Sequence, residues 1–105
     1  MAQFTAYQNK NPLSKKAVPL LLDIQSNFLD SLQTTIVVPL VKLEANRNKV
    51  LTQLTPAFAI EGIDYLMLTP QLAGIQRKEL GKVVADLEFA RTEIINALDF
   101  LFTGI

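Results

Sequence analysis

Residues 86–105, DLEFARTEIINALDFLFTGI, carry the clearest structural signal in the chain. Their apolar members recur at the spacing of one helix face, at Leu87, Ala90, Ile94, Leu98 and Leu101. This period predicts an amphipathic helix over residues 86–102. Gly104 follows the helix and suits the left-handed conformation that commonly ends one.

The end of this predicted helix is too apolar for a single packing face. Phe100, Leu101 and Phe102 are consecutive, so their side chains point in different directions around the helix axis. A sheet of the same domain cannot cover all three. We therefore expect a second subunit or another protein to cover the helix end.

The chain before the helix is predicted to form short strands separated by turns. Stretches that are rich in Val, Ile and Leu, or that alternate in polarity, predict strands over residues 3–8, 18–24, 34–41, 57–60, 65–68 and 76–84. Residues 61–64, EGID, have the composition of a hairpin turn. We also expect an exposed loop at 9–16, a loop or short helix at 43–54, and one helical turn at 71–75.

Two prolines fall within the predicted strands. Pro19 and Pro39 have no N–H group to donate to a sheet ladder. Each is therefore expected at an edge, an end or a bulge.

The connection between residues 25 and 33, QSNFLDSLQ, contains two large apolar residues in a polar setting. Phe28 and Leu29 are either tucked under the sheet or offered to a partner, and the pattern does not decide between the two.

Composition limits the class of protein. A chain of 105 residues fits one domain, 1–105. Ten basic and ten acidic residues leave no net charge to attract nucleic acid. Without cysteine or histidine the chain can have no disulfide, no cysteine nucleophile, no histidine triad and no common zinc site, and we expect no cofactor or metal. The sequence shows neither a signal-peptide pattern nor a membrane-spanning run, so we expect a cytoplasmic protein.

Several blocks of sequence, taken in order, resemble the CcdB family of bacterial toxins. They are LDIQSNFLD at 22–30, VVPL at 37–40, YLMLTPQLAGI at 65–75, VADL at 84–87 and the terminal Gly-Ile. The resemblance implies a mainly β, mixed α+β fold: a small antiparallel, barrel-like sheet of the Src-homology-3-like, CcdB/MazF type with a C-terminal helix.

The resemblance also implies a function. CcdB-like proteins are homodimeric toxins of type II toxin–antitoxin modules, and they are not enzymes. They bind the A subunit of DNA gyrase and trap the complex in which both DNA strands are cut, which blocks replication and transcription. A CcdA-like antitoxin, partly disordered when free, neutralises the toxin. The two together repress their own operon, so operator DNA is contacted only through the antitoxin complex.

Carried over to this chain, the gyrase-binding surface of the family falls on the helix end and on the connection after the second strand. The matching residues are Phe28, Leu29, Asp99, Phe102, Thr103, Gly104 and Ile105. Thr103 departs from the family pattern, in which the best-known members carry a tryptophan at this position. A threonine cannot stack on an arginine of the partner as a tryptophan can.

Two other functions are compatible with the sequence. A MazF-like or Kid-like endoribonuclease would need a base, an acid and a cation, for which Arg47, Asp64, Arg77 and Glu79 are the candidates. An inactive relic of the toxin is the other alternative, suggested by Thr103. The paired carboxylates at 23 and 30, 61 and 64, and 86 and 88 are interpreted as turn and cap residues.

Overall fold

The computed structural model describes residues 3–104, which form seven strands, one α-helix and five short 3-10 helices. The strands are β1 (Thr5–Asn9), β2 (Leu20–Asp23), β3 (Thr34–Lys42), β4 (Ala57–Ile60), β5 (Ile63–Met67), β6 (Ala73–Gln76) and β7 (Leu80–Asp86). The helices are η1 (Asn27–Leu29), η2 (Glu44–Lys49), η3 (Thr69–Gln71), η4 (Arg77–Glu79), η5 (Glu88–Ala90) and α1 (Arg91–Thr103).

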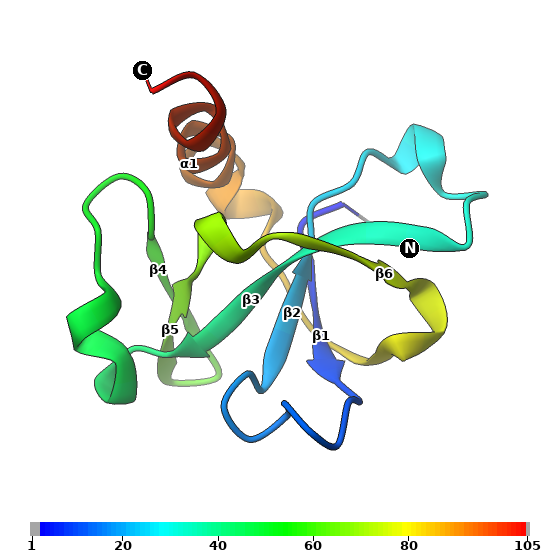
Figure 1. Cartoon of the computed structure of the whole chain (residues 1–105), viewed down its shortest axis with the longest axis horizontal. Helices are drawn as coiled ribbons and strands as arrows, with labels where there is room; N and C mark the ends of the chain where they lie inside the picture. Colours follow the sequence, from blue (N-terminus) through cyan, green and yellow to red (C-terminus); the bar gives the residue numbers. More distant parts are fainter. Residues whose placement is uncertain (1–2, 105) are drawn as a thin grey trace.

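All strand pairs are antiparallel and belong to one curled sheet with the order β4-β5-β3-β2-β1-β7. The long strand β3 organises it, because β2 pairs along one side while β6 and β5 share the other side. Figure 1 shows β3 crossing the molecule, with the helix α1 to one side of the strand, at the top of the view. The predicted fold, a mainly β, antiparallel, barrel-like sheet with a C-terminal helix, is confirmed.

The sheet has one large apolar cluster on one face and two small clusters on the other. The larger cluster, which includes the buried side of α1, contains Phe4, Ala6, Leu20, Leu22, Val38, Leu40, Phe58, Ile60, Tyr65, Met67, Leu87, Ala90, Ile94 and Ala97. Alternate residues of the same strands face the other way, where Leu21 and Val37 join one small cluster and Val41 another. Burial of both faces explains why the strands read as continuous apolar runs.

The two prolines differ in their positions. Pro19 lies just before β2, at a strand end as predicted. Pro39 lies inside β3 opposite Leu21, so the prediction of an edge, end or bulge is wrong for it. Its carbonyl accepts a hydrogen bond from Leu68 N–H at 3.0 Å. The nitrogen and the carbonyl of a strand residue point to the same side, so the Pro39 nitrogen faces β6 and β5. On that side β6 pairs with β3 only up to Val37 and β5 only from Leu40. The missing N–H of Pro39 therefore costs the sheet no hydrogen bond.

The C-terminal helix begins later than its apolar period predicts. It starts at Arg91 rather than at residue 86, because residues up to Asp86 belong to β7 and Asp86 pairs with Thr5 of β1. The Asp86 carboxylate then accepts the N–H of Glu88 at 2.9 Å, the cap role expected of it. Pairing with a neighbouring strand has thus overridden a local helical pattern.

The boundaries near β6 also differ from the prediction. The helical turn lies at 69–71 as η3, not at 71–75, and residues 73–76 pair with the first half of β3 instead. The last strand begins at Leu80, not at residue 76. The β4–β5 hairpin is confirmed with a shorter turn, Glu61-Gly62, whose φ angles of +52° and +80° are those of a two-residue type I′ turn.

Gly81 lies where β7 passes closest to β1. A Cβ atom added there would sit 2.9 Å from the backbone oxygen of Gln8 and 3.0 Å from its Cβ. The substitution Gly81→Ala is expected to lower the free energy of unfolding by about 1–3 kcal/mol, because the backbone must shift to admit the methyl group. Gly74→Ala is the matched control, since nothing lies within 4 Å of its added Cβ. Equal urea midpoints for the two variants would contradict this prediction.

Candidate partner-binding surface

The end of α1 is fixed by its own backbone. Gly104 has φ +76° and its N–H donates to the carbonyl of Phe100 at 2.9 Å, so the predicted left-handed helix end is confirmed. The Thr103 hydroxyl donates to the carbonyl of Asp99 at 2.7 Å. These bonds satisfy backbone carbonyls that would otherwise lack a donor at the end of a helix. The last turn of α1 is therefore capped by bonds within the helix itself.

The side chains at this end behave as their consecutive positions predict. Phe100 and Leu101 are half-buried, whereas Phe102 is 69% exposed and Thr103 and Gly104 are exposed. Asp99 is exposed one turn before Thr103. Ile105, the last residue of the predicted site, lies outside the described residues.

The second part of the predicted site is the η1 turn. Ser26 caps it by accepting the N–H of Phe28 on its hydroxyl at 3.2 Å. Phe28 is 96% exposed and Leu29 is 44% exposed. The alternative that Phe28 is tucked under the sheet is therefore excluded. Burying a side chain of this size in a partner contributes about 1.5–3 kcal/mol.

The helix end and the η1 turn are separate in one copy of the chain. Asp99, Phe102, Thr103 and Gly104 are grouped on the last turn of α1, whereas Phe28 and Leu29 lie on the segment between β2 and β3. Figure 1 shows the red helix end and the cyan η1 turn as two distinct projections. A single partner must therefore span both, or two copies must bring them together.

The whole described region matches one protein family. Residues 3–104 align with the family model described as CcdB protein. The chain belongs to the CcdB family. It is therefore a toxin of the toxin–antitoxin class, in a family that poisons gyrase and is not one of enzymes. Within residues 3–104, no helix combines the length and apolarity needed to cross a membrane.

The candidate catalytic residues of an endoribonuclease do not come together in this CcdB-family chain. Arg47 and Asp64 line a pocket of about 240 Å³ beside Lys42, at one end of β3. Arg77 follows β6, which pairs with Thr34 at the other end of that strand. The two ends of this nine-residue strand are eight residue steps apart, roughly 26 Å along the strand. Glu79 is used as a cap and accepts the N–H of Gln76 at 3.2 Å.

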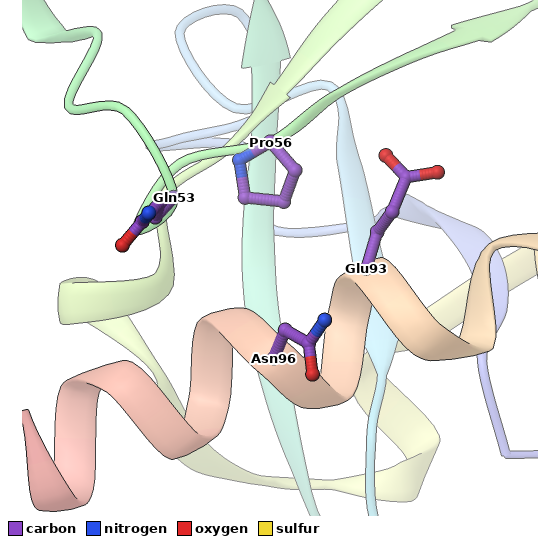
Figure 2. Close-up of a pocket in the computed structure, with 4 residues that line it drawn as sticks. All are labelled: Gln53, Pro56, Glu93 and Asn96. Carbon is purple, nitrogen blue, oxygen red and sulfur yellow. The ribbon is translucent and has the colours of Figure 1, made fainter. Parts of the chain in front are cut away.

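A pocket between α1 and the loop before β4 does not supply a catalytic group of residues either. Its volume is about 460 Å³ and it is lined by Gln53, Pro56, Glu93 and Asn96. Figure 2 shows the first two on the loop before β4 and the last two on α1. One carboxylate with two amides offers no nucleophile paired with a base. Among residues 3–104, no three His, Cys, Asp or Glu side chains are grouped to hold a metal.

One polar network near η1 was not predicted from the sequence. Asp23 at the end of β2 and Arg77 after β6 form an ion pair with 3.6 Å between Oδ2 and Nη1. From the sequence, Asp23 is interpreted as a turn or cap residue, and Arg77 is a candidate cation of a ribonuclease site. Only the pairing of β6 with β3 brings them together, and local sequence carries no signal of it.

Proposed function

We propose that this toxin binds the A subunit of DNA gyrase through the α1 end and the η1 turn, and that it traps the complex in which both DNA strands are cut. One observation carries the proposal. Two aromatic side chains, Phe28 and Phe102, project into solvent from the two segments to which the resemblance assigns the gyrase-binding surface. Exposed aromatic residues of this kind are typical centres of protein interfaces.

The mechanism is binding without chemistry. The toxin acts as a homodimer, which presents two helix ends to the two-fold symmetric A-subunit dimer. A toxin that prefers the cleaved enzyme shifts the equilibrium toward it by the affinity difference alone. A shift from 1:99 to 99:1 needs about 5.5 kcal/mol. Two copies of Phe28 and Phe102, at about 1.5–3 kcal/mol each when buried, supply that difference provided that they are buried only against the cleaved state.

Neutralisation falls to the cognate CcdA-like antitoxin in the cytoplasm. Its disordered part folds on contact and covers apolar surface near the loop of residues 9–16 and the sheet edges. Leu13 in that loop is 95% exposed, and β4, β6 and β7 are edge strands of the described sheet. The toxin–antitoxin complex contacts operator DNA and represses the operon, whereas the toxin alone has no net charge to attract DNA.

The proposal is tested by titrating the purified chain into the breakage–reunion domain of the gyrase A subunit, followed by calorimetry. Saturable binding with one toxin dimer per A-subunit dimer is expected. If binding is absent, growth arrest on expression together with RNA cleavage by the pure protein would favour the endoribonuclease alternative. A protein that neither binds gyrase, nor arrests growth, nor cleaves RNA would be an inactive relic of the toxin.

Thr103 is expected to limit the affinity for gyrase. The variant Thr103→Trp places a large flat ring on the exposed helix end and is expected to lower Kd about tenfold or more by stacking on a cation of the partner. Thr103→Ala is the control, because it loses only the hydroxyl bond to Asp99. A Kd that changes equally in both variants would show that the ring finds no partner.

A further inference from the structure

The side chain of Arg77 reaches from η4 to the segment that follows the Phe28 turn. Its Nε donates to the carbonyl of Leu32 at 2.7 Å, and its Nη2 donates to the carbonyl of Leu29 at 3.2 Å. The backbone N–H of Arg77 donates to the carbonyl of Gln33 at 2.8 Å. One residue therefore contacts the segment at three carbonyls. A guanidinium suits this role because its donors are held in a rigid planar fork.

The other end of the guanidinium is anchored on a buried charge. Nη1 faces Oδ2 of Asp23 at 3.6 Å, with the side chains 15% and 3% exposed respectively. Nη1 makes no hydrogen bond to a described residue, so charge rather than hydrogen bonding holds it there. Oδ1 of Asp23 accepts the Thr35 hydroxyl at 2.7 Å and the Gln25 N–H at 3.1 Å. These two hydrogen bonds fix the orientation of the Asp23 carboxylate, and the ion pair in turn fixes the position of the Arg77 guanidinium.

The η1 segment lacks the apolar anchors that usually order a loop. None of the η1 residues is buried, and Leu29 and Leu32 are about half exposed. Polar contacts must therefore hold the segment in place of packing. If they are lost, the fraction of molecules with Phe28 in its binding orientation falls, and the apparent Kd rises in the same proportion.

We propose that Arg77 is a positioning residue for partner binding. Its guanidinium bridges the carbonyls of Leu29 and Leu32 and the buried Asp23 carboxylate, and so keeps the η1 turn in the conformation that exposes Phe28 to a partner. The consequence for affinity rests on the proposed gyrase function. The local ordering of the turn does not, which allows the two to be tested separately.

The first test measures hydrogen exchange at the amides of Leu29, Asp30 and Leu32, which are hydrogen-bonded within the segment. Arg77→Lys keeps the charge but loses the fork. The double variant Arg77→Met with Asp23→Asn removes both charges of the ion pair and keeps an acceptor for Thr35. Both are expected to exchange about tenfold faster at these amides, with β2 and β3 unchanged. Arg47→Met, exposed at the far end of β3, is the control and should not alter them.

Two exchange results would overturn the proposal: unchanged protection of the segment in the double variant, or loss of protection throughout the sheet, which would make Arg77 a general structural residue.

The second test measures Kd for the gyrase A domain and expects about a tenfold rise for both variants. An unchanged Kd with a loosened turn would show that order there is irrelevant to binding. No binding by the native chain would sink the gyrase function and leave the exchange result to decide the role of Arg77.

Discussion

Removal of Gly104 and Ile105 is expected to raise the Kd for the gyrase A subunit about 100-fold or more, which ends poisoning. The truncation deletes the left-handed residue whose N–H closes the helix end on Phe100. It also moves the terminal carboxylate to Thr103, beside the exposed ring of Phe102. A charge placed within an apolar contact must lose its water on binding, which is costly without a partner. Binding of native and truncated chains to the A-subunit domain measures the effect.

The same truncation should leave the fold intact. Gly104 is exposed, with nothing within 4 Å of its added Cβ, so no described core contact is lost. We expect a Tm within about 2 °C of the native chain and undiminished antitoxin binding. An unfolded truncated protein would show that the terminus belongs to the core. Full-strength gyrase binding after truncation would remove the helix end from the site.

Phe28→Ser is expected to raise the Kd for gyrase about 10- to 100-fold, because it removes a large aromatic side chain from the interface. Phe28 is 96% exposed in the unbound chain, so its loss creates no cavity. Stability should change by less than about 0.5 kcal/mol. Surface plasmon resonance on immobilised A-subunit domain would report the Kd, and urea unfolding the stability.

Leu13→Ser provides the matched control, because Leu13 is 95% exposed on a different loop. It loses a similar exposed apolar surface but should bind gyrase as the native chain does. Equal losses in both variants would mean that general surface hydrophobicity, rather than the η1 turn, governs binding.

Much of the fold could be predicted from the sequence where local pattern and tertiary structure agree. The β4–β5 hairpin and the left-handed Gly104 follow from short-range chemistry. The start of α1 could not, because the period of residues 86–90 is helical while Asp86 is held by β1. Pro39 could not be placed either, because nothing local reveals that β3 changes partner at that residue.

The candidate site divides in the same way. Phe102 could be predicted to be exposed because three consecutive apolar residues cannot all face one sheet. The pattern left Phe28 open, and the resemblance to the CcdB family assigned it to the site. Both side chains are exposed. The support beneath Phe28 was not predicted. Asp23 and Arg77 are far apart in the chain and meet only through the sheet, so each alone resembled an ordinary surface charge.

The most direct test of poisoning is gyrase-mediated DNA cleavage with purified components. Supercoiled plasmid, gyrase and ATP are incubated with the toxin, stopped with detergent and protease, and resolved by electrophoresis. We predict that linear DNA accumulates with toxin concentration and disappears when cognate antitoxin is added. Absence of linear DNA at toxin concentrations that saturate the A-subunit domain would contradict trapping of the cleaved complex, whatever the affinity.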